Sequence, residues 1–272
     1  MRISLIGYGS MGKMITEKLA ASDEGKNHSF FVANRSKEKL QNVPSGVVVC
    51  DSNSDCARGA DIVFLCVRPV DLKTVLEEIV PVLSDKAFVI SLNGSVTFAM
   101  LEKCFSGKMA KVIPSVTAEV DRSQTLVTYN CKVEKTDKEN LEKLLSVFGN
   151  VIELPENEVG MGSELVSCMP GFIASIFDVL CTSAKKHTSI PDAQVVKMVL
   201  QTMCATGELM LEKDMSFEDV VTRVATPGGI TQEGTKVVYE KFPEAADLLF
   251  NKTLEKRKMT AERAQASFGE DA

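Results

Sequence analysis

The chain opens with the stretch Arg2-Ile3-Ser4-Leu5-Ile6-Gly7-Tyr8-Gly9-Ser10-Met11-Gly12, an apolar run that leads into glycines spaced as G-x-G-x-x-G. Helical spacing follows, so the glycines lie between a predicted strand and a predicted helix, which is typical of a dinucleotide-binding turn. Gly7 permits the tight turn, Gly9 lets a pyrophosphate approach the backbone, and Gly12 lets the helix pack on the strand. Free N–H groups at the helix start favour phosphate. The alternative is a glycine turn in an α/β protein that binds no nucleotide.

Strand-like and helix-like segments alternate through the first half of the chain. The predicted strands are 2–6, 29–33, 47–50, 61–66, 86–91, 109–113, 124–129 and 150–154, and the predicted helices are 10–21, 70–80, 96–103 and 137–148. This alternation predicts an α/β fold with a doubly wound, Rossmann-type parallel sheet. Beyond residue 155 the pattern predicts helices alone, at 157–187, 190–212, 216–223, 228–241 and 243–268. We therefore expect a Rossmann domain at 1–155 and an all-helical domain at 156–272.

Composition limits the kind of partner. The chain has 272 residues, of which 44% are hydrophobic and 25% charged, as in ordinary globular proteins of one or two domains. A net charge of -6 argues against nucleic acid as the partner. The first strand begins at Arg2, so we expect no signal or transit peptide. Eight cysteines without a C-x-x-C pair indicate reduced thiols and a cytoplasmic protein, and only two histidines argue against a metal site.

One segment is apolar enough to raise the question of a membrane. Residues 165–184 contain no Lys, Arg or His. A helix that is apolar on all sides either spans a membrane or is deeply buried. Pro170 and Asp178 interrupt this segment, so we expect burial, against a second subunit, and no membrane span.

The end of the second predicted strand bears on cofactor choice. NAD-selective folds usually place Asp or Glu there, whereas this chain has Asn34 followed by Arg35, Ser36 and Lys37. A guanidinium suits a 2′-phosphate. The pattern favours NADP(H), with NAD(H) as the alternative cofactor. If these residues bind no cofactor, Ser36 simply caps a helix and the neighbouring basic residues lie on the surface.

Other polar residues follow strands at the carboxyl edge of the predicted sheet, where ligands bind in open α/β folds. Asn53 follows the third strand, Arg68 follows the fourth, and the turn Ser91-Leu92-Asn93-Gly94-Ser95 ends the fifth. For Asn53 and Arg68 the residues alone leave cofactor contact and open surface as equal readings.

A second glycine turn lies in the helical half, at Thr226-Pro227-Gly228-Gly229-Ile230-Thr231. Exposed N–H groups at such a helix start make a seat for a carboxylate, and Thr231 can present its hydroxyl to a nearby nitrogen. The alternative is a Pro-Gly turn capped by Thr226.

Together these residues resemble the pyrroline-5-carboxylate reductase family over roughly residues 1–265. The motifs that carry the resemblance are Gly7 to Gly12, Asn34-Arg35-Ser36, Val67-Arg68-Pro69, Ile113-Pro114-Ser115, Pro170 and Pro227-Gly228-Gly229-Ile230-Thr231. The resemblance implies hydride transfer from NAD(P)H to the imine of 1-pyrroline-5-carboxylate, which yields L-proline. It also implies homodimers or multiples of dimers, joined through the helical domain.

The resemblance assigns a role to each matching position. Cofactor binding falls to Gly7, Tyr8, Gly9, Ser10, Met11, Gly12, Asn34, Arg35, Ser36, Asn53, Val67, Arg68, Pro69, Leu92, Asn93 and Gly94. Substrate binding falls to Pro114, Ser115, Asp214, Gly228, Gly229, Ile230 and Thr231, and Thr231 is the catalytic residue, hydrogen-bonded to the ring nitrogen. The dinucleotide turn must then come within hydride-transfer distance of the Pro-Gly-Gly loop, in one chain or across subunits.

The chain also departs from the family pattern. Ile113-Pro114-Ser115 stands for Met-Pro-Asn, Ser167-Cys168-Met169 precedes Pro170 in place of Gly-Ser-Gly, and Lys111 replaces an arginine. The sequence is thus similar to a diverged branch, like the reductase-like proteins of bacterial late-competence operons. The alternatives are a reductase of another cyclic imine and a non-catalytic NADP-binding protein. A β-hydroxyacid dehydrogenase is disfavoured because residues 158–184 lack its helix lysine.

Overall fold

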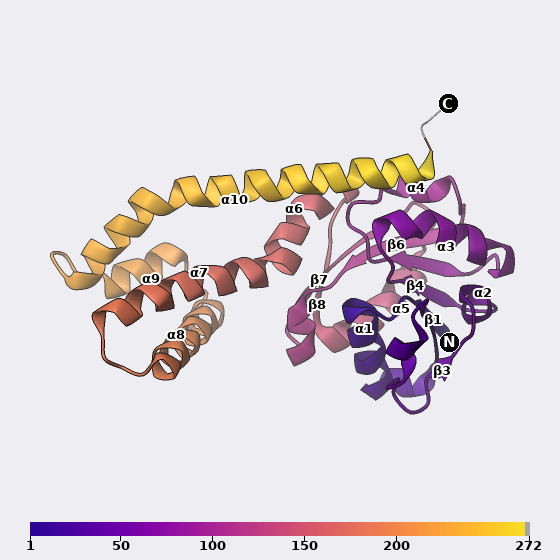
Figure 1. Ribbon diagram of the computed structural model, residues 1–272, viewed down its shortest axis with the longest axis horizontal. Helices are drawn as coiled ribbons and strands as arrows, with labels where there is room; N and C mark the ends of the chain where they lie inside the picture. Colours follow the sequence, from indigo (N-terminus) through magenta and orange to yellow (C-terminus); the bar gives the residue numbers. More distant parts are fainter. Residues whose placement is uncertain (270–272) are drawn as a thin grey trace. The chain divides into compact units, whose positions relative to one another are not determined.

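A computed structural model of the chain describes residues 1–269, which divide into two compact units (Figure 1). The first unit comprises residues 1–170 together with the described residues from Thr253 onward, and the second is Gly171–Lys252. The sheet ends at Glu153, close to the boundary expected at residue 155, whereas the first unit continues to Pro170. The boundary at 155 stays a prediction.

An eight-stranded sheet forms the centre of the first unit. Its strands are β1 (Arg2–Ile6), β2 (Ser29–Ala33), β3 (Val48–Val49), β4 (Ile62–Leu65), β5 (Phe88–Ser91), β6 (Lys108–Ile113), β7 (Ser123–Tyr129) and β8 (Gly149–Glu153). They lie in the order β3-β2-β1-β4-β5-β6-β7-β8. Each corresponds to a predicted strand, and the Rossmann-type α/β fold is confirmed.

The last two strands depart from the parallel sheet that the alternation predicted. Strands β1 to β6 pair in parallel, but β7 runs antiparallel to β6, with Lys111 opposite Thr128, and β8 is parallel to β7. Residues 114–122 alone join β6 to β7, which is too short for the crossover of about a dozen residues that parallel neighbours need. This link reverses at Asp121, whose φ is 58°.

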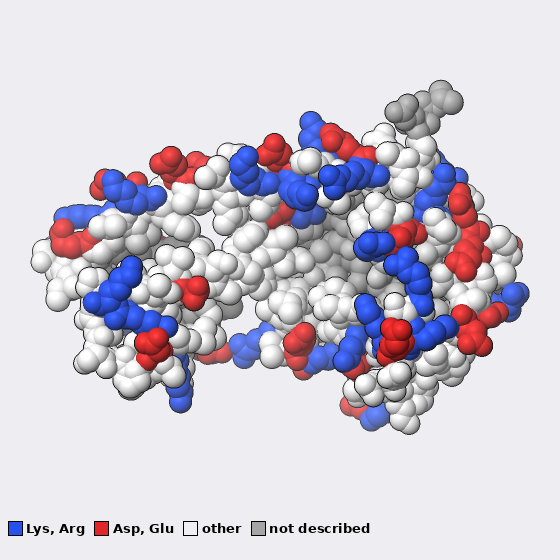
Figure 2. Space-filling view, in the orientation of Figure 1, with Lys and Arg blue, Asp and Glu red and all other residues white. Residues whose placement is uncertain are grey.

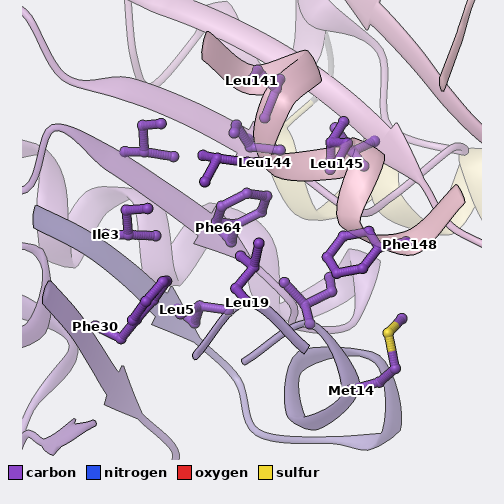
Figure 3. Close-up of a cluster of buried hydrophobic side chains, with 14 of the residues drawn as sticks. Ile3, Leu5, Met14, Leu19, Phe30, Phe64, Leu141, Leu144, Leu145 and Phe148 are labelled. Carbon is purple, nitrogen blue, oxygen red and sulfur yellow. The ribbon is translucent and has the colours of Figure 1, made fainter. Parts of the chain in front are cut away.

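Helices cover both faces of the sheet. On one face, α1 (Ser10–Ala21) and α5 (Lys135–Leu145) pack on side chains such as Ile3, Phe64 and Phe148 (Figure 3). On the other face lie α2 (Asn53–Ala57), α3 (Leu72–Ile79) and α4 (Phe98–Glu102). Successive strand residues point to opposite faces, so Phe64 and its neighbour Leu65 serve different clusters. Helix α2 was not predicted, because a single capped turn gives almost no periodic signal.

The end of the chain completes the second apolar cluster. Ala264 and Phe268, in the last turns of α10 (Ile230–Phe268), are 0% and 5% exposed and pack with residues of α3 and α4. The prediction of two helices at 228–241 and 243–268 is therefore wrong. Pro243 lies inside a single helix, because a proline removes one backbone hydrogen bond and the many remaining turns keep the helix formed.

The second unit is helical. It contains α7 (Met169–Ala184) from Gly171 onward, α8 (Asp192–Lys213), α9 (Phe217–Val224) and α10 up to Lys252. Helix α6 (Val159–Ser163) and a π-helical turn (Glu164–Cys168) precede α7.

Residues 165–184 are largely uncovered within the described chain, and their expected burial against a second subunit stays a prediction. Of the α7 side chains only Cys181 is buried, and Val179 and Leu180 are exposed. The helical run Glu156–His187 is long and apolar enough to cross a membrane by length and composition, and 6% of its most apolar window is buried within the chain. The described residues provide no layer that covers this helix, so its apolar surface is left for an external contact.

Candidate cofactor and substrate site

The first unit contains a cavity of about 690 Å³ at the carboxyl ends of β1, β2 and β4. Eight of the predicted cofactor residues line it: Gly7, Gly9, Asn34, Arg35, Ser36, Asn53, Val67 and Arg68. The cavity is also lined by Lys37, which was expected beside Arg35 and Ser36 as a donor to the cofactor. Further lining residues had no predicted role, among them Lys39, Asp51, Cys66, Asp71 and Glu78. The predicted cofactor residues Tyr8, Ser10, Met11, Gly12, Pro69, Leu92, Asn93 and Gly94 lie outside this lining.

The three glycines of the first turn occupy different environments. Gly7 has a φ of +100°, and a Cβ there would lie 2.5 Å from the Cys66 carbonyl oxygen. A Cβ on Gly12 would lie 2.0 Å from the Gly7 carbonyl oxygen, so helix and turn are in direct contact. Gly9 faces open space, with no atom within 4 Å of a Cβ, and it lines the cavity. A pyrophosphate therefore fits against Gly9, at the start of α1.

Asn34 holds the first turn to the end of β2. Its Oδ1 accepts a hydrogen bond from the Tyr8 N–H at 2.8 Å, and its Nδ2 donates to the Ser36 carbonyl at 2.9 Å. Both ends of the amide are engaged, so Asn34 shapes the cavity wall. Arg35 and Ser36 are the neighbouring groups that remain for a ligand.

Basic side chains gather where the adenosine end of a dinucleotide is expected. Among residues 1–269, Arg35 is exposed and forms no hydrogen bond or ion pair. Lys37 is held by the carbonyl oxygens of Cys50 and Asp51, at 3.1 and 2.8 Å. Lys39 lines the same part of the cavity. The Arg35 guanidinium, which lines the same cavity as Lys37 and Lys39, suits a 2′-phosphate.

Asn53 and Arg68 are both engaged by carboxylates of the cavity wall. Asn53 donates to Glu78 Oε2 at 2.7 Å, and Arg68 makes a bidentate contact with Asp71 at 2.7 and 3.2 Å. The hydrogen bond from Arg68 lowers the pKa of the Asp71 carboxyl. Behind them, burial raises the pKa of the Cys66 thiol to about 12, so this thiol is neutral at physiological pH.

The predicted turn Leu92-Asn93-Gly94 does not line the cavity but contacts a residue that does. Asn93 is 8% exposed, and its Nδ2 donates to the carbonyl oxygen of Val67, a cavity residue, at 3.1 Å. A Cβ on Gly94 would lie 3.3 Å from Ser163 Oγ and 3.4 Å from Arg257 Nη1. The turn is thus packed against α6 and the last part of α10.

Pro114 and Ser115 are buried where β6 ends. The Ser115 N–H donates to Ser123 Oγ at 3.1 Å, and Ser115 Oγ accepts from the Thr117 N–H at 3.4 Å. Ser115 therefore caps the short link to β7. Its predicted contact with substrate stays a prediction.

The Pro-Gly-Gly loop opens α10 in the second unit and uses part of its hydrogen-bonding capacity internally. The Gly229 N–H donates to the Thr226 carbonyl at 2.9 Å, and the Gly228 N–H donates to Gln232 Oε1 at 2.8 Å. Ile230, the first residue of α10, is 95% exposed. The Gln232 amide thus occupies one donor of the expected carboxylate seat.

The remaining predicted substrate residues also belong to the second unit. Within the described part of the chain, the exposed Thr231 hydroxyl makes no hydrogen bond, so it is available to a ligand. Asp214 is exposed, adopts a left-handed φ of 49° and ends α8. A cavity of about 640 Å³ beside the loop is lined by Pro227 and Gln232 but not by Thr231.

Two ion pairs near the carboxyl edge, each with one buried partner, were not predicted from the sequence. Arg257 donates to Glu164 Oε1 through Nε at 3.1 Å and Nη2 at 2.7 Å, and Glu164 is 1% exposed. Lys111, noted earlier only as a replacement, pairs with Glu156 at 2.8 Å. A lysine inside the apolar run of β6 was the available signal, because a charge there needs a partner.

Acidic and basic side chains are interspersed on the face of the molecule that Figure 2 shows. This distribution is consistent with the net charge of -6 and with a small-molecule ligand in a local basic pocket.

Comparison with known proteins gives two family matches, one in each half of the chain. Residues 2–95 match the family described as NADP oxidoreductase, coenzyme F420-dependent, and residues 156–260 match pyrroline-5-carboxylate reductase dimerisation. The second match supports a homo-oligomer formed through the helical region.

Individual relatives cover nearly the whole chain. Pyrroline-5-carboxylate reductase 3 of Bacillus subtilis is 33% identical over 265 residues, covering 96% of this chain and 97% of that protein. ComE operon protein 4 of the same organism is 24% identical, covering 93% of this chain and 94% of that protein. The structure of Plasmodium falciparum pyrroline carboxylate reductase with NADP bound has the same fold, with a TM-score of 0.84 at 23% identity, covering 96% of this chain and 98% of that one.

Proposed function

Because the chain belongs to the pyrroline-5-carboxylate reductase family, we propose that it reduces 1-pyrroline-5-carboxylate to L-proline with NADPH. The observation that carries the proposal is the cavity of about 690 Å³, where open space at Gly9 meets the unpaired guanidinium of Arg35. These features fit the two ends of one dinucleotide: a pyrophosphate against the glycine turn and a 2′-phosphate at Arg35.

NADP(H) is the proposed cofactor in preference to NAD(H). No carboxylate stands at the end of β2 to bind a free ribose 2′-hydroxyl, and Arg35, Ser36 and Lys37 offer donors instead. When bound, this cofactor supplies the hydride that is added to the imine carbon.

The residues of the second unit are proposed to bind and orient the imine acid. The N–H groups at the start of α10 and its positive dipole end attract the carboxylate. The free Thr231 hydroxyl orients the ring nitrogen, and a pyrroline imine is basic enough to be protonated near neutral pH. The products are then the secondary amine and the oxidised cofactor, and the protein contributes position and electrostatics. No histidine acid is required.

The assembled enzyme is proposed to be a cytoplasmic homodimer or a multiple of dimers. The exposed apolar side chains of α7, including Val179 and Leu180, support this proposal, since a helix with that much uncovered apolar surface needs a partner. The match of residues 156–260 to a dimerisation family points to the same region.

A steady-state assay tests the reaction. Purified protein should oxidise NADPH when 1-pyrroline-5-carboxylate is added, faster than when imines of other ring size or charge are added. NADPH binding without turnover of any imine across a broad pH range would reject the enzyme in favour of a cofactor-binding protein. Best activity on another imine would move the assignment to a related reductase.

Thr231→Ala tests the proposed catalytic residue. Loss of a hydrogen bond to a charged nitrogen should slow turnover by about ten- to a hundredfold, with NADPH affinity unchanged. Thr231→Ser keeps the hydroxyl and should retain most of the activity. A crystal soaked with NADP⁺ and L-proline gives the strictest check, because residues 227–231 far from the nicotinamide ring would reject the assignment.

A further inference from the structure

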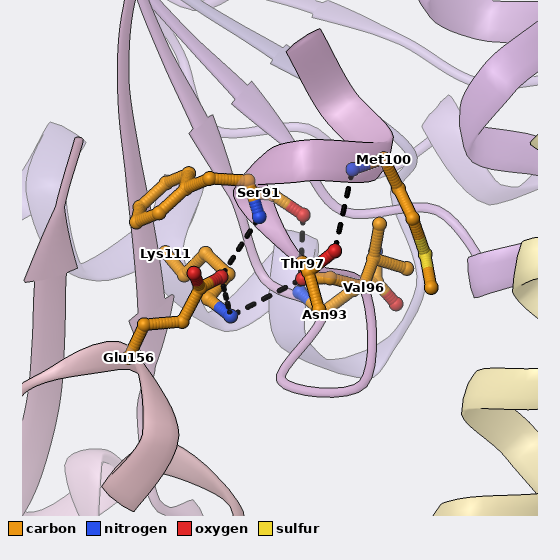
Figure 4. Close-up of polar contacts among 8 residues, drawn as sticks. Ser91, Asn93, Val96, Thr97, Met100, Lys111 and Glu156 are labelled. Atoms are coloured by element: carbon orange, nitrogen blue, oxygen red, sulfur yellow. Dashed lines mark hydrogen bonds and ion pairs between the residues drawn. The ribbon is translucent and has the colours of Figure 1, made fainter. Parts of the chain in front are cut away.

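Lys111 is a buried cation in the middle of β6. It is 1% exposed, and its Nζ donates to Glu156 Oε1 at 2.8 Å and to the Val96 carbonyl oxygen at 3.2 Å (Figure 4). The Nζ also lies 5.3 Å from the centre of the Phe98 ring. Each of these neighbours belongs to the loop after β5 or to the segment after β8, so Lys111 connects three strand ends.

Glu156 contacts the other side of the same loop. Its Oε1, which accepts from Lys111, also accepts a hydrogen bond from the Phe98 N–H at 2.8 Å. Lys111 and Glu156 therefore hold a carbonyl at residue 96 and an N–H at residue 98. These two backbone groups flank Thr97, whose hydroxyl caps α4 by accepting from the Met100 N–H. The closing end of the 92–97 loop is fixed at each of these points.

The opening end of the loop is attached to the cofactor cavity. The Asn93 N–H donates to Ser91 Oγ at 3.2 Å, and Asn93 Nδ2 donates to the Val67 carbonyl at 3.1 Å. Val67 lines the cavity. Hydrogen bonds thus fix both ends of the loop, one end to Lys111 and Glu156 and the other to the cavity wall, and the backbone of residues 94 and 95 joins the two ends.

The ion pair between Lys111 and Glu156 adds little to the stability of the fold, because burying the lysine costs free energy. Burial lowers the pKa of the Lys111 ammonium, and the hydrogen bond and charge of Glu156 oppose that shift. The ion pair takes the Lys111 ammonium out of water and leaves 35% of the Glu156 side chain exposed, so the cost of burying the lysine offsets part of the attraction. Its advantage is geometric, since a charged donor with two fixed acceptors specifies one loop conformation.

We propose that Lys111 and Glu156 are positioning residues that hold the 92–97 loop in the conformation required for cofactor binding. The inference rests on the proposed function, because it assumes that the cavity takes NADPH. The two residues act through Val96 and Phe98 on the loop, and through Asn93 on Val67. They contact neither the cofactor nor the substrate.

Titration with NADPH, followed by quenching of its fluorescence or by calorimetry, tests the inference on the full chain. Lys111→Met keeps the length of the side chain and removes the charge, and it should weaken NADPH binding about tenfold. Lys111→Arg keeps the charge and can donate to both acceptors, so it should restore affinity to within about threefold of the unchanged chain. We call the contacts of Lys111 and Glu156 with the 92–97 loop the clamp. Rescue of NADPH affinity by Lys111→Arg would show that the charge of residue 111, and not its packing alone, is required.

The same strand offers a matched control. Lys108 is the first residue of β6, three residues before Lys111, and pairs with Asp137 at 2.7 Å and with Glu134 at 3.3 Å, away from the 92–97 loop. Lys108→Met makes the same chemical change and should leave NADPH affinity unaltered. If Lys111→Met does not fold, Glu156→Gln takes its place, since it weakens the charged partner without emptying the site, and a severalfold loss of affinity is expected.

The outcomes distinguish the two proposals. If the unchanged chain binds NADPH and Lys111→Met binds it equally well, the clamp is rejected and the proposed function stands. Equal losses from Lys111→Met and Lys111→Arg also reject it. If the unchanged chain does not bind NADPH, both proposals fall.

Discussion

Two glycine turns each begin a helix, but only one of them is held by the rest of the fold. The turn before α1 is packed on the sheet: a Cβ on Gly12 would lie 2.0 Å from the Gly7 carbonyl oxygen. The turn before α10 is held by its own neighbours, through Thr226 and Gln232. Around Gly228, no atom lies within 4 Å of where a Cβ would be.

The difference between the two turns shows which part of the candidate site is held rigid by packing within one chain. The first turn has a rigid backing, with Gly9 directed into an open cavity, so the phosphate seat that we propose there needs no partner chain to shape it. The second turn is exposed and satisfies two of its own donors, so its ligand must compete with Gln232 or use the donors that remain. We therefore expect substitutions in the first turn to affect folding and cofactor binding, and those in the second to affect substrate binding and turnover without loss of folding.

Gly12→Ala should have the largest effect. The methyl group would collide with the Gly7 backbone, and we expect a loss of more than about 3 kcal/mol in the free energy of unfolding. Urea unfolding followed by circular dichroism measures it. Gly9→Ala is the control, because its methyl group meets open space. It should fold normally and bind NADPH at least about tenfold more weakly. Equal stability of Gly12→Ala and the unchanged chain would contradict the rigid backing.

Thiol reactivity should separate the cavity floor from the open surface. Burial raises the pKa values of Cys56 and Cys66 to about 12, so both remain thiols as the pH rises from 7 to 9. Since the thiolate is the nucleophile, iodoacetamide at pH 8 should modify exposed Cys131 at least about a hundredfold faster than either. Mass spectrometry of digested protein gives the rates. Modification of Cys66 as fast as Cys131 would show that the first turn is not shielded.

Arg35→Ser should change the preference between the two nicotinamide cofactors. Loss of a guanidinium–phosphate contact should raise the KM for NADPH about tenfold and leave the KM for NADH nearly unchanged. Lys39→Ser is a matched control on the same cavity wall, and it should have a smaller effect. An equal rise for both cofactors would place Arg35 outside the 2′-phosphate seat.

Gln232→Met should have the smallest effect, and it addresses the second turn. The change removes the oxygen that accepts from Gly228 and keeps the length of the side chain. The Gly228 N–H would then be free to donate to a substrate carboxylate. The KM for the imine should therefore fall about threefold, with kcat unchanged. Gln201→Met on α8 controls for a general surface effect. A higher KM would mean that Gln232 supports the loop instead of competing with the ligand.

The elements that were predictable are those fixed by local sequence. All eight strands were found because Val, Ile, Leu and Phe runs are bounded by turn residues, and Gly7 to Gly12 were placed correctly by spacing alone. The antiparallel direction of β7 was not predicted, because it depends on how the short 114–122 link connects β6 to β7. Pro243 suggested a helix end, yet α10 continues through it.

Eight of the sixteen predicted cofactor residues line the cavity, and the contacts that hold these residues in place were not predictable. Asn34 and Asn93 were assigned to the cofactor, but their amides bond to neighbouring loops. Lys111, Glu156, Glu164 and Arg257 come from distant parts of the sequence, so no local pattern could pair them. The motif also does not reveal which N–H groups of the Pro-Gly-Gly loop already have a partner. The conformation of the Gln232 side chain determines this.

The burial of Ala264 and Phe268 against the sheet sets an order for biosynthesis. The strands of the first unit leave the ribosome more than a hundred residues before these two side chains do. Until Ala264 and Phe268 have been synthesised, the nascent sheet therefore has one incompletely covered face, and that face is where we expect a chaperone to bind.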